Sequence, residues 1–519
     1  MDFPTPPGID FLRLLEFPLE RVPDKTAFVD DAGSVTFAEL DRRANGLARH
    51  FLELGLAPGE RVATVLPNGI PFVLAEIATL RAGLVKVPLN IRFHREEVLY
   101  ALADCRPRVL ICGPSLAAEV EARRERVPSL ERILVVGGSF ESASAAAEGT
   151  AAEGAAVRWP HPPGAPILLR YTGGTTGRPK GIVHTAESFL AIHLDVLREL
   201  AIPGDEVALH LGHLSHGLNF MWAAWYAQGA TQILRERFDP AAVWRDLAGY
   251  GVTYTYMVPT MIHRLLEADD GSLGAVALRS FLYASAPMPV PLLRRAIARF
   301  GPIFTQVYTL SEAPVITTIM RPEEHLEIEG RCGPRLGSCG RPVVTMDLRL
   351  VDEAGREVEE GAVGEIAVRS TNCMAGYWEL PEETVATLVG GWVMTGDMAR
   401  RDEAGFLYLV DRKKDIIITG AFNVWPKEVE TVLYRHPAVD QCAVVGVPDP
   451  EWGEIIKAYV VLKPGAAASA EELVGLCREH LADYKKPRQI AFVAALPLSP
   501  VGKISRKDLR ERAAGEAGA

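Results

Sequence analysis

The sequence lacks the features of a secreted, membrane-spanning or metal-clustered protein. Its seven cysteines are scattered, with no Cys-x-x-Cys pair and no histidines at zinc spacing, so we expect buried, reduced thiols. The first residues contain neither the basic group nor the apolar run of a secretory signal. No later stretch approaches the ~20 apolar residues that a membrane span requires. These absences predict a cytoplasmic protein without a membrane span.

The chain also lacks an excess of positive charge. It has 55 Lys and Arg against 66 Asp and Glu, a formal net charge of -11, which gives nucleic acid no general attraction. Hydrophobic residues make up 48% and charged residues 23%, the balance of a globular protein. Because 519 residues are too many for one ordinary core, at least two domains are expected.

The first 300 residues or so alternate between strand-like and helical patterns. An apolar run at 61–66, a turn, a helical pattern at 72–81 and a second run at 84–88 predict a βαβ unit. Further strands are predicted at 108–112, 207–211, 231–234, 252–257 and 280–284. This pattern is typical of mostly parallel sheets covered by helices. The Ala- and Ser-rich segment 139–156 has few large apolar groups and predicts a surface insertion or mobile loop.

The pattern changes after residue 343. Alternating runs at 347–351, 364–369 and 405–410 predict an antiparallel β subdomain. Beyond them, helical patterns at 427–434 and 470–481 and strand patterns at 441–447 and 456–462 predict a smaller α+β domain. The preferred boundary between the two domains is at 412–415, and the fold class is α/β.

The most specific local signal is Tyr-Thr-Gly-Gly-Thr-Thr-Gly-Arg-Pro-Lys-Gly at 171–181, after an apolar strand at 167–169. Glycines let backbone N–H groups approach an anion, threonine hydroxyls add donors, and Lys180 adds a positive charge. The segment therefore predicts a phosphate-binding loop. It is not a Walker A motif, because two residues separate Gly177 from Lys180.

This loop resembles the signature loop of the adenylate-forming superfamily, which includes acyl- and aryl-CoA synthetases, non-ribosomal adenylation domains and beetle luciferases. Four later stretches also resemble the family's motifs, in the family's order: Val-Tyr-Thr-Leu-Ser-Glu-Ala at 307–313, Gly-Trp-Val-Met-Thr-Gly-Asp at 391–397, Asp-Arg-Lys-Lys-Asp at 411–415 and Pro-Val-Gly-Lys-Ile at 500–504.

The resemblance implies a large N-terminal domain, 1–411, that binds ATP and acid, a hinge at 412–414, and a small mobile C-terminal domain, 415–519. It implies ATP-dependent activation of a carboxylic acid to acyl-AMP with release of pyrophosphate. The acyl group then passes to coenzyme A. The alternative is a stand-alone adenylation enzyme that loads the phosphopantetheine of an acyl carrier protein. ATP, Mg²⁺ and coenzyme A are the implied cofactors.

Attack of a carboxylate on the α-phosphate brings two anions together, so the site must supply cations and fixed donors. The resemblance gives the catalytic roles to Lys503, Glu312, Thr172 and Lys180. Glu312 would hold Mg²⁺, a hard cation that takes carboxylate and phosphate oxygens.

The resemblance also implies how the nucleoside is bound. Asp397 would accept hydrogen bonds from the ribose hydroxyls beside Arg412, and Tyr308 would lie against the adenine. The implied nucleotide-binding residues are Thr172, Gly173, Gly174, Thr175, Thr176, Gly177, Lys180, Ser285, Ala286, Pro287, Tyr308, Thr309, Ser311, Glu312, Asp397, Arg412 and Lys503.

His216 matches an aromatic residue that in the family lines the acid pocket and gates the thiol's approach, with His213 as a nearby competitor. Lys414 matches the hinge residue, because Lys503 and a pantetheine channel cannot face one site at once. The implied acid pocket consists of His216, Leu218, Trp222, Thr260, Ala284 and Thr309. The implied pantetheine contacts are His216, Gly420 and Ala421.

Three residues depart from the family pattern: Thr309 replaces Gly, Ser311 replaces Thr, and Ala421 replaces the second Gly of its motif. Thr309 adds bulk beside the pocket, and Ala421 places a methyl group near the thiol route. The segment 216–222 contains no carboxylate that could bind the amino group of a substrate, which favours a neutral apolar or aryl acid. The sequence does not determine the chain length of the acid, whether the acid is aromatic, or whether it is an acid other than a carboxylic one.

Two rival classes are disfavoured. A kinase is disfavoured because the sequence contains neither a Walker A motif nor the kinase signature motifs. A binding protein without catalysis is disfavoured because it would not need the five residues Lys180, Glu312, Asp397, Arg412 and Lys503 together.

Overall fold

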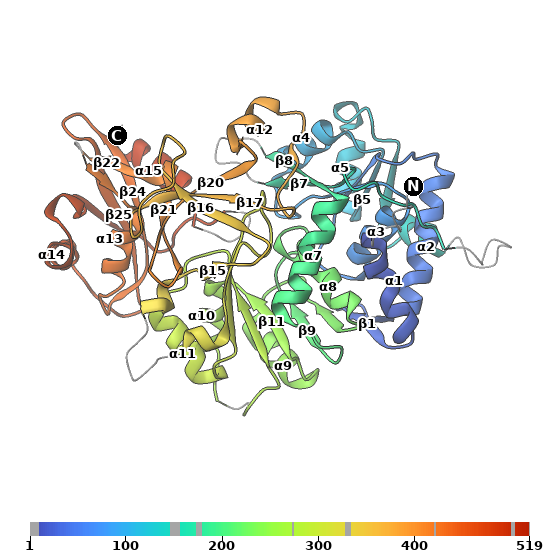
Figure 1. Cartoon of the computed structure of the whole chain (residues 1–519), viewed down its shortest axis with the longest axis horizontal. Coiled ribbons are helices and arrows are strands. Elements are labelled where there is room, and N and C mark those ends of the chain that lie inside the picture. Colours follow the sequence, from blue (N-terminus) through green and yellow to red (C-terminus); the bar gives the residue numbers. More distant parts are fainter. Residues whose placement is uncertain are drawn as a thin grey trace, which may run out of the picture. The chain divides into compact units, whose positions relative to one another are not determined.

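The computed structural model describes residues 10–145, 156–172, 179–271, 274–326, 334–419, 422–499 and 504–517. The chain forms two compact units (Figure 1). The larger unit consists of Met1–Asp347 and Val368–Val393, and the smaller unit consists of Leu348–Ala367 and Met394–Ala519. Each unit has its own apolar core.

The first sheet of the larger unit has the order β18-β8-β7-β4-β3-β5-β6. Strands β3, β4, β5 and β6 are parallel, β7 is parallel to β4, and β8 and β18 run antiparallel. Apolar residues of α4 and α5 pack against β3, β4 and β5. The bounds are β3 (Arg61–Val65), β4 (Val85–Pro88), β5 (Val109–Cys112), β6 (Arg132–Val135), β7 (Pro166–Thr172), β8 (Lys180–Thr185), β18 (Gly376–Tyr377), α3 (Ile70–Arg81), α4 (Arg95–Cys105) and α5 (Pro114–Glu121).

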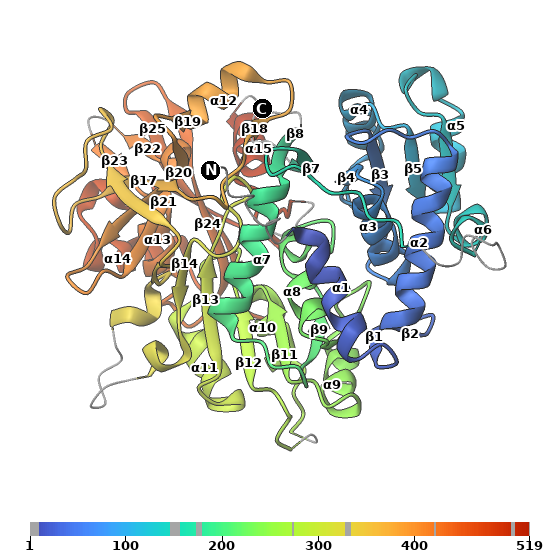
Figure 2. The same ribbon diagram turned by 45° about the vertical axis from the view of Figure 1, so that its right-hand side comes forward.

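The second sheet of the larger unit has the order β15-β14-β13-β12-β11-β9-β10-β1-β2. Its central strands, from β13 to β1, are parallel. Helices α9, α10 and α11 lie against them (Figure 2), where their apolar residues form one core with β9, β11, β12 and β13. The bounds are β1 (Thr26–Val29), β2 (Ser34–Thr36), β9 (Val207–His210), β10 (Thr231–Leu234), β11 (Tyr254–Met257), β12 (Ser280–Tyr283), β13 (Phe304–Tyr308), β14 (Thr318–Met320), β15 (Arg341–Pro342), α9 (Pro240–Gly249), α10 (Pro259–Glu267) and α11 (Val290–Phe300).

The other helices of the larger unit lie between or beside these sheets. A capping threonine begins α2 and another begins α7, each accepting a backbone N–H of the first turn. Helix α3 is buried along its whole length. The bounds are α1 (Phe11–Arg21), α2 (Phe37–Glu53), α6 (Ser139–Ala145), α7 (Ala186–Leu200), α8 (Trp222–Ala227) and α12 (Pro381–Thr387).

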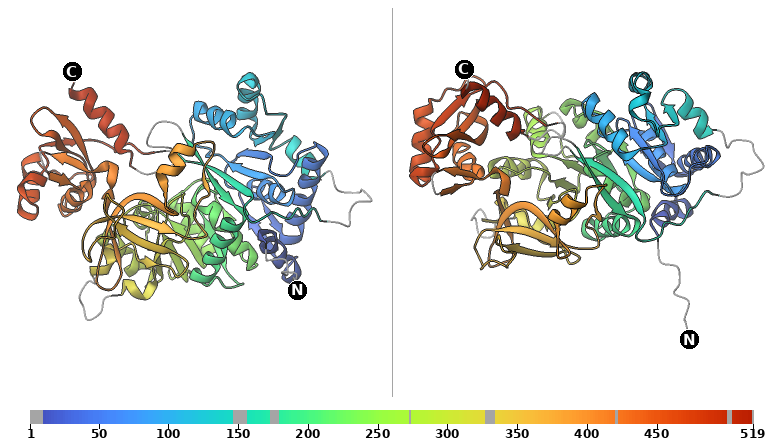
Figure 3. Two further views of the ribbon diagram at one scale, coloured as in Figure 1. Left: turned by 45° about the horizontal axis from the view of Figure 1, so that its top comes forward. Right: turned by 90° about the horizontal axis from the view of Figure 1, so that it is seen from above.

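The smaller unit contains an antiparallel pair, β20 and β21, and a second sheet of order β23-β22-β25-β24, with β26 beside β25. Alternate residues of β24 face two cores, because side chains of a strand point to opposite faces. Helices α13 and α14 cover one face and α15 covers the other (Figure 3). The bounds are β16 (Asp347–Val351), β17 (Gly364–Arg369), β20 (Trp392–Arg401), β21 (Leu407–Arg412), β22 (Ile417–Thr419), β23 (Phe422–Val424), β24 (Val439–Asp449), β25 (Gly453–Leu462), β26 (Gln489–Phe492), α13 (Pro426–Leu433), α14 (Ala470–His480) and α15 (Arg506–Ala517).

The α/β class and the sheets of mainly parallel strands are confirmed. The prediction of a loop from residue 139 is wrong in its first part, because Ser139–Ala145 forms helix α6. Phe140 and Ala143 are buried there, and α6 packs beside α2. Two apolar anchors in seven residues were enough to fix a short helix. Residues 146–155 of the predicted loop lie outside the described residues.

The smaller unit begins earlier than the predicted C-terminal domain 415–519, because it includes β20 and β21. The domain boundary and the hinge at 412–414 therefore stay predictions.

Five of the six cysteines in the described ranges are buried, and Cys373 is half-buried. In the same ranges, no helix is long and apolar enough to cross a membrane.

Candidate active site

The two strands that flank the predicted phosphate-binding loop form a tight hairpin. Thr172, at the end of β7, pairs with Lys180, at the start of β8. Gly181 follows because a Cβ there would lie 2.9 Å from Leu169 Cδ1 and 3.1 Å from Tyr171 Cζ. The predicted loop residues Gly173, Gly174, Thr175, Thr176 and Gly177 lie outside the described residues. The hairpin thus fixes both ends of the predicted loop.

Lys180 lies beside Tyr377, a residue that the sequence analysis did not identify. The Lys180 Nζ is 5.4 Å from the centre of the Tyr377 ring and 3.9 Å from Glu383 Oε1. Tyr377 comes from β18, which pairs with β8 in the sheet, so a segment distant in sequence completes this side of the site. No motif spacing could have joined residues 180 and 377.

Glu312 accepts a hydrogen bond from the same tyrosine. The Tyr377 hydroxyl donates to Glu312 Oε1 at 2.9 Å. Burial, followed by the charge of Glu312, raises the pKa of Tyr377, so the phenol stays protonated and remains a donor. A carboxylate that accepts one such bond keeps lone pairs for a hard cation. Lys180, Tyr377 and Glu312 are therefore brought together as a cation, a donor and a carboxylate.

The loop that presents Glu312 is held at three points. The Thr309 hydroxyl accepts from the Val315 N–H at 2.9 Å, and His184 donates to the Ser311 carbonyl at 3.0 Å. The Glu312 carbonyl accepts from the Met374 N–H at 2.8 Å. The threonine at 309 thus uses its hydroxyl to close the loop.

The predicted Mg²⁺ ligand fits the chemistry of that ion, since Glu312 offers a carboxylate. Within the described ranges, no group of three or more His, Cys, Asp or Glu side chains could hold a metal ion.

Tyr308 and Ser285 lie at the carboxyl ends of two neighbouring parallel strands. Tyr308 is the buried last residue of β13, and Ser285 lies just after β12. Ser285 has a φ of 72°, an uncommon backbone conformation for a residue with a side chain. Its hydroxyl is 2.8 Å from the Tyr256 hydroxyl. Ala286 and Pro287 come next, so this predicted part of the nucleotide site lies at the carboxyl edge of the sheet, where α/β sheets bind ligands.

The predicted acid-pocket residues are only partly brought together. Leu218 and Tyr256 both lie close to Gly212, where an added Cβ would be 3.6 Å and 3.4 Å from them. Ala284 is buried directly after β12, while Thr260 is exposed in the first turn of α10. Trp222 is fully buried and packs against Phe28 and Tyr226. Tyr256 is a further residue that the sequence analysis missed.

His216, the predicted gate, contacts a buried arginine. Its Nδ1 is 2.7 Å from Arg170 Nη2. Burial lowers the pKa of the competitor His213 to about 4. Arg170 lies on β7, two residues before Thr172, and had no motif to mark it.

The predicted ribose site lies in the smaller unit and is formed by cross-strand partners of β20 and β21. Asp397 pairs with Arg412, and Arg412 Nε is 3.1 Å from Asp397 Oδ1. Gly396 takes a φ of 70° and donates its N–H to Glu365. The Thr395 hydroxyl accepts from the Asp397 N–H at 3.1 Å. This turn fixes the position of the carboxylate.

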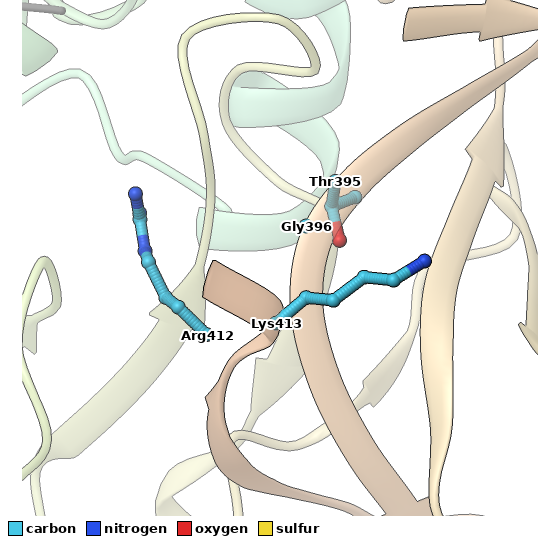
Figure 4. A pocket seen from close by; sticks show the side chains of 4 residues that line it. All are labelled: Thr395, Gly396, Arg412 and Lys413. Atoms are coloured by element: carbon cyan, nitrogen blue, oxygen red, sulfur yellow. The ribbon is translucent and has the colours of Figure 1, made fainter. Parts of the chain in front are cut away.

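A cavity of about 360 Å³ opens beside this pair, lined by Thr395, Gly396, Arg412 and Lys413. The side chains of Arg412 and Lys413 extend in opposite directions from the end of β21 (Figure 4). Lys413 Nζ donates to Glu365 at 2.9 Å, which holds it away from Arg412. The cavity is thus bordered by one guanidinium whose partner is a buried aspartate.

The predicted hinge is surrounded by an ion-pair network within the smaller unit. Lys414 lies in the short helix η5 (Lys413–Asp415), and its side chain lies outside the described atoms. Arg506 is 3.4 Å from Asp411, 3.6 Å from Asp415 and 2.8 Å from Glu430. Arg506 begins α15, three residues after the predicted catalytic Lys503. Lys503, Gly420 and Ala421 lie outside the described residues.

The family comparison gives the class of protein, an adenylate-forming enzyme. The chain belongs to the AMP-binding enzyme family: the family's model matches residues 15–378, and its C-terminal domain model matches residues 428–503.

Curated relatives cover almost the whole chain. A medium/long-chain-fatty-acid–CoA ligase, FadD8 of Mycobacterium tuberculosis, is 36% identical over 96% of this chain and 89% of its own length. A feruloyl-CoA synthase of an Amycolatopsis species is 37% identical over 94% and 96%. A fatty acid–[acyl-carrier-protein] ligase, ScoC of Streptomyces coeruleorubidus, is 32% identical over 97% and 96%.

Solved structures agree. The anthranilate CoA ligase AuaEII, in complex with anthranoyl-AMP, has a TM-score of 0.89 and 29% identity, with 99% of each chain covered. The ATP-bound MatB of Rhodopseudomonas palustris has a TM-score of 0.87 and 28% identity, covering 97% of this chain and 99% of that one. The predicted family, the fold class, the use of ATP and the class of AMP-forming acid–thiol ligase are confirmed.

Proposed function

We propose that this enzyme joins a neutral apolar or aryl carboxylic acid to AMP and then transfers the acyl group to coenzyme A. One observation supports the first step most directly: Tyr377 lies beside Lys180 and donates to Glu312, at the base of the predicted phosphate-binding loop. A cation and a carboxylate of the kind that binds Mg²⁺ thus lie together next to the predicted loop, which supports the proposal. That is the charge distribution that an attack of carboxylate on ATP needs.

In the first step the acid carboxylate attacks the α-phosphorus, and the bond to pyrophosphate breaks. Lys180 and the loop hydroxyls neutralise charge on the phosphates, and Lys503 draws the carboxylate and the α-phosphate together. Glu312 would hold Mg²⁺, and the ion would offset negative charge on the phosphate oxygens. Asp397 accepts hydrogen bonds from the ribose hydroxyls, with Arg412 beside it, and Tyr308 packs against the adenine.

In the second step the thiol attacks the acyl carbonyl, and AMP leaves. Rotation about Lys414 withdraws Lys503 and admits the pantetheine arm beside Gly420 and Ala421. His216 separates the acid pocket from the thiol route. Because the two arrangements exclude one another, the reaction alternates between them.

Coenzyme A is the preferred acceptor because the relatives FadD8 and feruloyl-CoA synthase are named for CoA products. The relative ScoC is named for a carrier-protein acceptor. A carrier protein is therefore the second candidate for the same chemistry. The relatives' names cover both fatty and aryl acids, in keeping with a pocket that lacks a carboxylate in 216–222.

Exchange of labelled pyrophosphate into ATP tests the first step without any thiol. The enzyme is incubated with Mg-ATP, labelled pyrophosphate and one acid at a time from ferulate, benzoate, octanoate and dodecanoate. We expect label in ATP only when an accepted acid is present, and no exchange in a Glu312→Gln variant that keeps the wild-type melting temperature. Exchange without any acid would contradict the proposal.

A further inference from the structure

Arg170 is a buried cation that forms no ion pair with a carboxylate of the described residues. Only 3% of the residue is exposed. Its Nε has no hydrogen-bond partner, and it forms no ion pair with any residue that the structure describes. Burial lowers the pKa of Arg170 to about 10, with the charge of Glu312 acting in the opposite direction, so the guanidinium is charged at neutral pH.

A second buried cation in the same unit shows what a purely structural charge looks like here. Lys86 is 1% exposed and pairs directly with the buried Glu76, and it also donates to Asn219 at 2.9 Å. Its charge is neutralised inside the protein. A buried charge without such a partner is strongly disfavoured, so Arg170, unlike Lys86, is suited to pairing with an anion from outside the protein.

The groups around Arg170 belong to the proposed acid site. Its Nη2 is 2.7 Å from His216 Nδ1, and its Cζ lies 4.8 Å from the centre of the Phe220 ring. Tyr256 and Glu312 lie close enough to act on its charge. Arg170 also shares a face of β7 with Thr172, because side chains two apart on a strand point the same way. The guanidinium therefore lies on the same face of β7 as Thr172, the residue before the predicted phosphate-binding loop.

The bond to His216 fixes the state of the imidazole. Arginine has donors and no acceptor, so His216 Nδ1 must accept and the ring proton must sit on Nε2. Beside a guanidinium, a second positive charge is disfavoured, so the ring stays neutral. The remaining ring nitrogen of His216 is then an N–H donor.

We propose that Arg170 and His216 together form the subsite that receives the reacting carboxylate of the acid, with Arg170 supplying the charge and also holding His216 as an Nε2–H donor. This inference rests on the proposed function and assigns the recognition of the acid's carboxylate to a residue outside the family's motifs. The subsite takes a carboxylate whatever the remainder of the acid, and it does not take ATP.

The kinetic test compares Arg170→Met, Arg170→Gln and Arg170→Lys with Arg279→Gln, a surface arginine paired with Asp205 at 3.0 Å. Pyrophosphate release is measured with ferulate, benzoate, octanoate and dodecanoate. In Arg170→Met and Arg170→Gln we expect KM for every accepted acid to rise at least about tenfold, while KM for Mg-ATP changes less than about twofold. Arg170→Lys should recover part of the loss, and Arg279→Gln should match the wild type. Equal rises in both KM values, or a rise confined to some acids, would overturn the proposal.

A spectroscopic test does not depend on turnover. In ¹⁵N-histidine-labelled protein, with the His216 signal assigned through His216→Asn, we expect a neutral ring protonated at Nε2, and a shift of this signal on titration with benzoate. In Arg170→Gln the signal should show mixed tautomers and a weaker response to benzoate. A wild-type ring protonated at Nδ1, or an unchanged signal in the variant, would overturn the pairing even if no acid were turned over. Absence of turnover with a normal His216 signal would instead count against the proposed function.

Discussion

At Glu312 one phenolic hydroxyl determines how the carboxylate is presented. Tyr377 approaches from β18, and its hydroxyl donates to Glu312 Oε1 at 2.9 Å. Without this bond the carboxylate would be free to rotate away from the phosphate-binding loop. The hydroxyl therefore orients the carboxylate that we propose to bind Mg²⁺.

We expect Tyr377→Phe to lower kcat/KM for Mg-ATP about tenfold, the cost of one hydrogen bond to a charged group. KM for the acid should not change. Steady-state pyrophosphate release at varied Mg-ATP measures this. Tyr250→Phe, at an exposed residue after α9, is the matched control and should leave both constants unchanged. An unaltered kcat/KM in Tyr377→Phe would show that the hydroxyl has no part in presenting Glu312.

Lys503→Ala separates the two steps. We expect it to abolish acyl-AMP formation from ATP, because the charge that joins carboxylate and α-phosphate is lost, and to spare thioester formation from supplied acyl-AMP. Product analysis by mass spectrometry for each half-reaction measures this. Lys507→Ala, an exposed lysine of α15, is the control. Equal loss in both half-reactions would refute the role of Lys503.

The residues that sequence analysis missed share a physical reason. Arg170, Tyr256 and Tyr377 lie on strands whose neighbours in space are far away in sequence. Glu312 and Lys180 could be identified because they lie in motifs, while the groups that orient them depend on strand pairing. A single sequence does not contain that pairing.

At the scale of elements, the hydrophobic pattern predicted well wherever a segment was long or fully apolar. Strand β10 has the predicted bounds, and α3 begins two residues before its predicted start. Helix α6 was not predicted, because its composition resembles that of a loop and its contacts with α2 and β6 stabilise it. Tertiary packing overrode local composition there.

The hinge is an element whose motion can be blocked. Proline at 414 fixes φ and removes an N–H, so it resists the change in dihedral angles that a rotation requires. We expect Lys414→Pro to form acyl-AMP and then stall, and Lys414→Ala to complete both steps. Single-turnover experiments that quantify acyl-AMP and acyl-CoA over time measure this. Thioester formation at the full rate in Lys414→Pro would place the hinge elsewhere.

At the scale of the whole molecule, buried histidines link stability to pH. Burial lowers the pKa of His184 and His193 to about 3 and that of His210 to about 4, and all three lie in the larger unit. Their ordinary pKa is 6.5, so the unfolded chain binds more protons than the folded one between these values. The stability is complete above pH 6.5 and falls as the pH decreases towards 4.

We therefore expect the melting temperature to be steady from pH 8 to 7 and to fall steeply from pH 6.5 to 5. The reason is that the free energy of unfolding decreases by about 1.4 kcal/mol per pH unit for each histidine. Thermal unfolding followed by circular dichroism measures this. His193→Leu should reduce the slope below pH 6.5. A melting temperature that does not change down to pH 5 would contradict the burial of these rings.

The order of the five motifs was enough to predict the fold class and the enzyme class of the whole chain. The division into units was not, because β20 and β21 join the smaller unit through contacts that no motif records. The identity of the acid could not be predicted either, because contacts such as those of Leu218 and Tyr256 near Gly212 depend on how distant strands pair.

The most direct test of the account is pyrophosphate release from Mg-ATP with the same panel of acids, with and without coenzyme A, and with all products identified by mass. The account predicts acyl-AMP and pyrophosphate from an accepted acid alone, and the acyl-CoA thioester with AMP when coenzyme A is added. ADP as the product, or acyl-AMP that coenzyme A never converts to a thioester, would contradict it.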